Sequence, residues 1–491
     1  MYSLGIDVGT SSVKVSLLDI ETGICVASAT NPKVEAPIKA ACKGWAEQDP
    51  DSWWTYLCDG VREIAAEHPV NEVKSIGITY QMHGLVCVDK DCRPVRDAII
   101  WCDSRAIETG AKALEEIGYD RCMPHLLNSP GNFTASKLAW VRQNEPELYS
   151  KIYKFMLPGD YMAYKFSGEV TTTETGLSEG ILWDFAEGCR ADFLADYYGI
   201  EKEKFATVVP SIGVQCRTDA ATQALLGIPE GTPICYRAGD QPNNAFSLNV
   251  LNPGEIAATG GTSGVVYGVT DVPKADPQSR VNTFLHVNNT AKDPRLGVLL
   301  CINGTGIMNS WMHRNVSRDL SYPEMNALAA TAPAGSDGLS IIPFGNGAER
   351  VLGNRATGSR IAGLDLVRHS TAHMLRAAQE GIAFSFMYGI EIMQNLGLDL
   401  RVIRAGKANM FLSPVFRTTL ATLSGSSIEL LNTDGSLGAA RGGALGAGYY
   451  ACAKDAFADL TVEETVTPEA SWKAPLEDAY ALWKAELEKA L

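Results

Sequence analysis

The stretch LGIDVGTSSVKVSLLD, residues 4–19, decides the fold. Two runs rich in Val, Leu and Ile flank a turn that contains Gly, Thr and Ser, a pattern typical of a β-hairpin. Glycine lets the backbone approach an anion closely, and the N–H groups and hydroxyls of such a turn can donate hydrogen bonds to it. Asp-x-Gly-Thr is also an ordinary turn sequence. The hairpin alone therefore leaves a phosphate site and a plain turn open.

A second stretch of the same kind, EIAATGGTSGVVYGV, occupies residues 255–269. It again joins two β-rich runs through a Gly-Thr-Ser turn. Two domains that each present such a turn can grip a chain of phosphates from both sides. The sequence therefore predicts an α/β architecture built twice, with a nucleotide in a cleft between the two halves.

The length of 491 residues is enough for two sizeable domains, because single hydrophobic cores stop growing at roughly 250 to 300 residues. We place the boundary near Gly231, after a turn-rich segment, which gives domains 1–230 and 231–474. Apolar residues recur at helical spacing in three further segments, and a Gly- and Ala-rich helix is also expected. These helices are 51–67, 370–396, 435–452 and, as a docked terminal helix with the first domain as one candidate surface, 475–491.

Composition and charge exclude several classes of protein. The chain is 46% hydrophobic and 20% charged, which is ordinary for a packed globular protein. The formal net charge of −15 argues against nucleic acid as a partner, since binding a phosphate backbone needs a basic surface. We do not expect the N-terminal sequence to act as a signal peptide, and the sequence predicts no membrane span. The twelve cysteines lack CxxC spacing, which favours a reducing cytoplasm.

Asp240 is the candidate general base. It lies in the sequence RAGDQ, directly after an apolar run that predicts a strand. A carboxylate near the γ-phosphate of ATP could take the proton from an attacking hydroxyl. The alternative is an Asp that only stabilises its own turn.

Six motifs in this order resemble the FGGY family of carbohydrate kinases, and within that family the enzymes that phosphorylate xylulose. The resemblance spans nearly the whole chain. The motifs are GIDVGTS at 5–11, GWAEQDPDSWW at 44–54, QMHG at 81–84, IWCDSR at 100–105, GD at 239–240 and GTSG at 261–264.

The resemblance implies two actin-like, RNase H-like domains of the ASKHA class, with ATP and a sugar in the cleft between them. It further implies ATP-dependent phosphorylation of a small ketose, with D-xylulose and its 5-phosphate as the expected substrate and product. Ribulose, fuculose and glycerol are the alternative substrates. A sugar sensor without catalysis and an actin-like ATPase are the alternative classes of protein. A homodimer is one assembly that the resemblance allows.

The resemblance also assigns roles to individual residues. Asp240 is the expected base, and Asp7 is the expected acid that holds Mg²⁺, directly or through water. The phosphate path is expected to involve Gly9, Thr10, Ser11, Gly261, Thr262 and Ser263. Sugar contacts are expected from Gln81, Met82, His83, Asp240 and Gln241, with Trp101, Asp103 and Arg105 as further contacts or as residues behind them.

The adenosine site is expected at Gly406, Ala408 and Asn409. Here the chain departs from the glycine-rich pattern of the family, because Ala405 and Lys407 stand where glycines are usual. Gln241 replaces the Asn found in many xylulose-phosphorylating members. One extra methylene in a pocket is about the scale on which substrates are discriminated. The departures therefore bear on the adenine contacts and on the choice of ketose.

Overall fold

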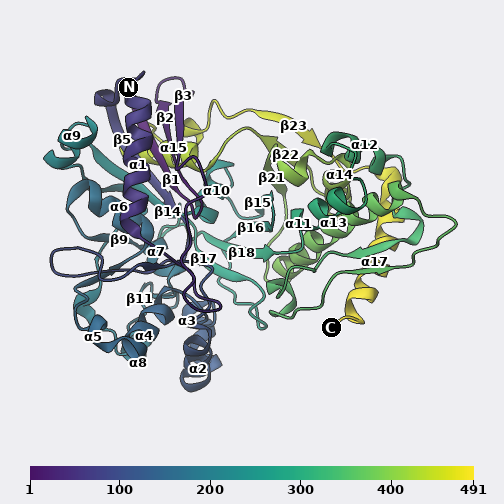
Figure 1. Cartoon of the computed structure of the whole chain (residues 1–491), viewed down its shortest axis with the longest axis horizontal. Helices are drawn as coiled ribbons and strands as arrows, with labels where there is room; N and C mark the ends of the chain where they lie inside the picture. The colour runs from purple at the N-terminus through teal and green to yellow at the C-terminus, as the bar shows by residue number, and fades with distance from the viewer. The chain divides into compact units, whose positions relative to one another are not determined.

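The computed structural model describes residues 1–491, the whole sequence, and divides into two compact units whose elements are labelled in Figure 1. The first unit comprises residues 1–249, 284–296 and 433–460. The second unit comprises residues 250–283, 297–432 and 461–491. Each unit is described by itself.

The first unit is built on a six-stranded sheet with the order β13-β14-β5-β1-β2-β3. β1, β2 and β3 are antiparallel neighbours, whereas β5 is parallel to β1 and β14 is parallel to β5. The strands of this sheet are β1 (Tyr2–Val8), β2 (Val13–Asp19), β3 (Cys25–Asn31), β5 (Val73–Tyr80), β13 (Ile212–Arg217) and β14 (Pro233–Gly239). The hairpin expected at residues 4–19 is confirmed as β1 and β2.

Helices and short strands complete the first unit. The helices are α1 (Pro50–Ala65), α2 (Ile107–Ile117), α3 (Tyr119–Leu126), α4 (Thr134–Asn144), α5 (Pro146–Tyr149), α6 (Pro158–Ser167), α7 (Glu174–Glu179), α8 (Asp192–Tyr198), α9 (Ala220–Leu226), α10 (Asp240–Ser247), α15 (Gly435–Gly446), α16 (Ala453–Ala456) and the 3-10 turns η1 (Val70–Glu72) and η2 (Lys202–Lys204). The short strands are β4 (Glu47–Gln48), β6 (Val86–Val88), β7 (Ala98–Ile99), β8 (Lys154–Met156), β9 (Thr171–Thr173), β10 (Trp183–Asp184), β11 (Cys189–Arg190) and β12 (Thr207–Val209).

Helices α1 and α15 cover opposite faces of this sheet. Ser16 Oγ lies 2.7 Å from Ser436 Oγ of α15, whereas the neighbouring Val15 packs against Gly60 of α1. Successive side chains of a strand point to opposite faces. Because α15 comes from residues 435–446, the chain returns to the first unit after it has formed most of the second.

Two glycines of the sheet allow α15 to pack closely. A Cβ at Gly5 would collide with the backbone oxygen of Ser436, and a Cβ at Gly77 would collide with that of Ala439. The Gly- and Ala-rich sequence of α15 suits this close packing, because small side chains let a helix approach a sheet.

The second unit repeats the strand pattern of the first. Its seven-stranded sheet has the order β17-β18-β16-β15-β21-β22-β23. β15 and β16 form the expected antiparallel hairpin, and β21 and β22 continue in parallel from β15. Its strands are β15 (Glu255–Gly260), β16 (Gly264–Thr270), β17 (Asn282–Leu285), β18 (Leu296–Ile302), β21 (Val402–Gly406), β22 (Ile428–Leu431) and β23 (Val462–Val466), beside the small pair β19 (Ser340–Ile342) and β20 (Arg360–Ala362).

The core of the second unit is centred on the long helix α13, which sequence periodicity predicted. Most of its side chains are buried, among them Leu375, Ile382 and Phe386. The helices of this unit are α11 (Gly306–Asn315), α12 (Tyr322–Ala330), α13 (Thr371–Asn395), α14 (Pro414–Ser424), α17 (Lys473–Glu488) and the 3-10 turns η3 (Ser336–Gly338), η4 (Arg350–Leu352), η5 (Asn409–Leu412) and η6 (Ala470–Trp472). None of the helices is both long and apolar enough to cross a membrane.

The repeated strand pattern agrees with the expected α/β class and its two RNase H-like halves. The division of the chain differs from the expected domains 1–230 and 231–474, because residues 231–249, 284–296 and 433–460 belong to the first unit. The first unit extends to Asn249 rather than ending near Gly231, because β14 pairs with β5 and α10 follows it directly. The terminal helix α17 packs on β19 and α14 of the second unit rather than on the first, with Trp483 fully buried in that core.

Candidate active site

Asp240 is the first residue of α10 and follows directly on β14. The side-chain amide of Gln241 donates a hydrogen bond of 3.1 Å to Asp240 Oδ2. Burial raises the pKa of Asp240 to about 6, although hydrogen bonds from Gln241 and from the backbone of Met82 act in the opposite direction. A carboxyl with that pKa is ionised at neutral pH and is still basic enough to accept a proton.

Asp7, near the end of β1, belongs to a group of three carboxyls. Burial raises the pKa of Asp7 to about 7, and the charges of Asp240 and Asp434 add to this effect. Lys14 opposes it, and its Nζ lies 2.6 Å from Asp434 Oδ2. Asp434 itself caps α15 through the N–H of Leu437. Sequence reasoning missed Asp434, since it lies more than 400 residues from Asp7 in the chain.

The QMHG segment follows β5 and brings His83 near the base. His83 has a left-handed backbone, with φ of 60°, a conformation uncommon for residues other than glycine. Its carbonyl accepts a hydrogen bond of 2.8 Å from the buried Nζ of Lys137. Its ring Nδ1 lies 2.9 Å from the carbonyl oxygen of Glu179. Several protein groups thus hold this strained residue in place.

Two phenylalanines pack against the imidazole of His83. The ring centroids of Phe133 and Phe284 lie 4.8 Å and 5.5 Å from it. Phe284 comes from the short segment 284–296, which the chain contributes to the first unit between two parts of the second. Sequence reasoning missed both phenylalanines. Their contact with His83 joins segments that are distant in sequence, and no local pattern indicates it.

Gln81 and Trp101 both contact Thr10 of the first hairpin turn. Gln81 is buried, accepts a hydrogen bond from Thr10 Oγ1 and donates one to Gln48, each of 3.1 Å. Trp101 donates its indole N–H to Thr10 Oγ1 over 2.9 Å, and 53% of its surface is exposed. The side-chain bonds of Gln81 thus link it to the protein, whereas the ring of Trp101 is open to a ligand.

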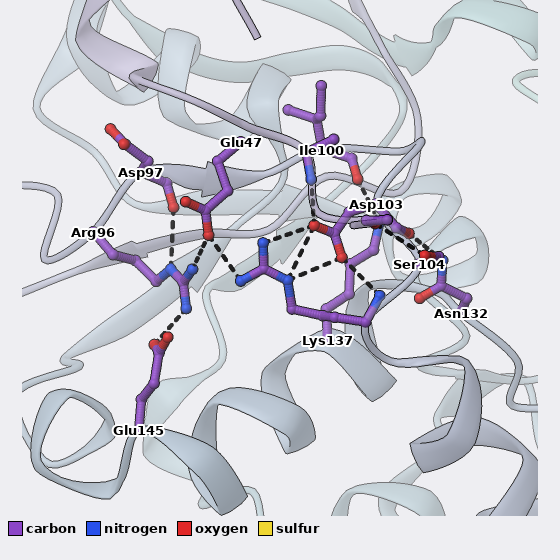
Figure 2. A network of polar contacts seen from close by, with 12 residues as sticks. Glu47, Arg96, Asp97, Ile100, Asp103, Ser104, Asn132, Lys137 and Glu145 are labelled. Carbon is purple, nitrogen blue, oxygen red and sulfur yellow. Dashed lines mark hydrogen bonds and ion pairs between the residues drawn. The ribbon is translucent and has the colours of Figure 1, made fainter. Parts of the chain in front are cut away.

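Asp103, labelled in Figure 2, forms a buried ion pair with Arg105. Asp103 is fully buried and also accepts a hydrogen bond of 2.6 Å from the backbone N–H of Ala46. The guanidinium of Arg105 lies 2.8 Å from Glu47 and stacks on Trp45 at 3.8 Å. With these protein partners Asp103 supports the loop that carries Trp101, and its carboxylate is not presented to a ligand.

The second unit contains a cavity of about 750 Å³ next to its Gly-Thr-Ser turn. Gly261, Thr262 and Asn409 are among its lining residues, whereas Ser263, Gly406 and Ala408 are not. Helix α12 contributes Asn326 and Ala327 to the wall. The cavity thus joins the second hairpin turn to the segment at 405–409, two features that lie about 150 residues apart in the sequence.

Comparison with known families decides the class of protein. The model of the FGGY family of carbohydrate kinases, N-terminal domain, matches residues 2–247, and the C-terminal domain model matches residues 256–451. The chain belongs to the FGGY family of carbohydrate kinases. The FGGY resemblance of the sequence motifs is thus confirmed, and with it the expected activity class, an ATP-using carbohydrate kinase.

Individual relatives of this FGGY chain agree with the family models. It is 30% identical over 465 residues to "Xylulose kinase" of Haemophilus influenzae, covering 91% of this chain and 90% of the relative. It is 27% identical over 466 residues to "Xylulose kinase" of Bacillus subtilis, covering 91% and 89%. Among solved structures, xylulose kinase from Rhodospirillum rubrum superposes with a TM-score of 0.89 at 24% identity, covering 100% and 99% of the two chains. The similarity to this solved structure shows that the two chains share a fold.

Proposed function

We propose that this FGGY kinase transfers the γ-phosphoryl group of ATP to D-xylulose and forms D-xylulose 5-phosphate. The observation that carries the proposal is Asp240, an acid with a pKa of about 6 at the start of α10. No lysine or arginine forms an ion pair with it among the charged pairs of the structure. Asp240 is therefore available to take the proton of the sugar hydroxyl during transfer.

His83 supports the binding of the sugar. A carbonyl oxygen can only accept, so the contact of 2.9 Å with Glu179 requires the proton on Nδ1 of His83. In the neutral ring Nε2 is then the acceptor. We propose that it receives a hydrogen bond from a sugar hydroxyl, with Met82, Gln241 and the exposed ring of Trp101 as further contacts.

Asp7 fits a role in holding Mg²⁺. Its carboxyl has a pKa raised by burial and by the charges of Asp240 and Asp434, so a cation nearby would be favourable. Mg²⁺ keeps several waters and binds substrate phosphates, so one or two carboxylates are enough to hold it. When bound, the ion would neutralise charge on those phosphates.

The nucleotide is proposed to bind in the second unit. The cavity of about 750 Å³ is large enough for an adenosine moiety and lies beside the turn at Gly261 and Thr262. Backbone N–H groups and the Thr262 hydroxyl would donate hydrogen bonds to phosphate oxygens. In the first unit, Gly9, Thr10 and Ser11 are proposed for the same task. A homodimer stays a prediction of the family resemblance, and a cytoplasmic location stays a prediction from the cysteine pattern.

The choice of D-xylulose rests on the relatives, whose names specify xylulose, and on the QMHG segment that the resemblance assigns to the sugar. Ribulose, fuculose and glycerol are the competing acceptors. The test is coupled release of ADP from Mg-ATP with a panel of ketoses, aldoses and polyols. The proposal expects D-xylulose to give the highest kcat/KM, and a higher value for another acceptor would refute the choice of substrate while leaving the kinase class unaffected.

A further inference from the structure

Glu179, the last residue of α7, is a buried acid with the Tyr80 hydroxyl as a nearby donor. Only 2% of its surface is exposed, and neither carboxylate oxygen forms a hydrogen bond of good geometry. Burying a polar group without a hydrogen bond is unfavourable, and natural proteins rarely leave one in this state. A leucine or methionine would fill the same space without that penalty. One hydroxyl cannot satisfy both oxygens of a carboxyl, so the acid at this position still calls for a further polar partner.

The Glu179 carboxyl lies beside the proposed base and sugar contacts. A Cβ at Gly239, the residue before Asp240, would lie 2.5 Å from Glu179 Oε2 and would also collide with Met82 Cγ. The backbone of Glu179 is bonded to His83 as well. Glu179 thus contacts or adjoins the positions proposed for the base and for two sugar contacts.

The charges around Glu179 favour its neutral form. Burial raises the pKa of Glu179 well above its usual range, and the charges of Asp240 and Asp160 add to this effect. The Tyr80 hydroxyl and the charge of Lys137 lower this pKa, but by less than burial raises it. The Lys137 ammonium donates to the carbonyls of His83 and Ile100 instead. A neutral carboxyl can both donate and accept a hydrogen bond, as a sugar hydroxyl can.

We infer that Glu179 is a specificity-determining residue, whose carboxyl forms a hydrogen bond with one hydroxyl of the acceptor sugar that is not phosphorylated. The inference rests on the proposed function and extends it. Met82 and the Glu179 carboxyl both lie against Gly239, and the flexible side chain of methionine can move aside when a ligand enters. A site built to bond a hydroxyl strongly rejects an analogue that lacks it, because the buried polar group is again left without a partner.

The test combines variants of Glu179 with sugars that each lack one hydroxyl. Wild type, Glu179→Leu and Glu179→Gln are assayed for kcat/KM with D-xylulose and its 1-deoxy, 3-deoxy and 4-deoxy analogues. In the wild type, one deletion should cost about tenfold or more beyond the other two. In Glu179→Leu that particular loss should disappear, while the other two losses stay as in the wild type. Glu179→Gln, which keeps a donor and an acceptor, should retain the wild-type pattern.

Equal losses for every deletion in the wild type and Glu179→Leu would overturn the inference, since a buried water or a structural role would produce that result. Thermal unfolding supplies an independent readout. Glu179→Leu should unfold close to the wild-type temperature, and a large drop would contradict the view that no strong partner within the protein satisfies the carboxyl. Wild-type turnover of D-xylulose with unchanged deletion patterns would refute only the role of Glu179, whereas absence of ketose turnover would refute the proposed function and the inference together.

Discussion

The side-chain amide of Gln241 donates a hydrogen bond of 3.1 Å to Oδ2 of Asp240. The donor stabilises the ionised form of its neighbour and so lowers the pKa of Asp240, against the larger opposing effect of burial. The residue at which this chain departs from many xylulose-phosphorylating relatives is therefore also a residue that adjusts the proposed base.

The pH dependence of the reaction follows from this pair. Asp240 must be ionised to accept a proton, so kcat/KM for the sugar should fall tenfold per pH unit below a pKa of about 6. Gln241→Leu removes the donor, so it should move this limb to higher pH, while ATP binding stays unchanged. A pH profile at saturating Mg-ATP measures both effects. An unchanged or lowered midpoint in Gln241→Leu would contradict the assigned hydrogen bond.

Replacing Asp240 by Asn should lower kcat by about a hundredfold to ten-thousandfold, the usual contribution of a general base. Binding of ATP should be retained, because the proposed nucleotide cavity lies in the second unit. The matched control is Asp196→Asn, the same change at an exposed position of α8, which should leave turnover as in the wild type. Steady-state kinetics and a nucleotide-binding assay decide the matter, and substantial turnover by Asp240→Asn would exclude its role as the base.

Asp103→Ala should destabilise the protein by about 3 kcal/mol, because it leaves the buried guanidinium of Arg105 without one of its partners. The control is Asp97→Ala on the same segment, which breaks an ion pair of 2.7 Å with the exposed Lys39 and should cost less than about 1 kcal/mol. Denaturant unfolding measures both. If Asp103→Ala instead raised the KM for the sugar with unchanged stability, Asp103 would be a sugar contact after all.

Ala327→Trp should weaken ATP binding by about tenfold or more, because the indole would occupy the cavity that Ala327 lines. The KM for the sugar should change little, since the proposed sugar contacts belong to the first unit. Ala481→Trp, at an exposed position of α17, controls for the added side chain. Titration with a fluorescent ATP analogue is the measurement. Equal affinity in Ala327→Trp and wild type would place the nucleotide elsewhere.

Local patterns predicted much of the fold. They predicted the hairpins at 4–19 and 255–269 and the helices α1 and α13. Gly-rich turns and apolar periodicity are properties of short segments, so they can be recognised without knowledge of distant contacts. Local patterns did not predict that β14 joins the first sheet or that α15 packs on it. Both depend on pairing and packing between segments that are distant in sequence. The surface on which α17 packs was not predicted for the same reason.

The candidate site shows a similar division. Asp7 and Asp240 were predicted from motifs that end strands, where polar residues often form sites, whereas His83 was expected only from the family resemblance. Asp103 stands in such a motif too, but its carboxylate is bound by Arg105 and by the backbone of Ala46. Sequence alone does not reveal which polar side chain forms an ion pair or hydrogen bond with a residue elsewhere in the protein.

The most direct test of the central claim is to identify the product that the purified protein forms from D-xylulose and Mg-ATP. The account predicts one phosphate ester on O5 of the sugar for each ADP released, formed at least about a hundredfold more slowly by Asp240→Asn, as phosphorus NMR and mass spectrometry of the product can show. Release of ADP and inorganic phosphate without a sugar phosphate, or an ester formed equally well by Asp240→Asn, would contradict it.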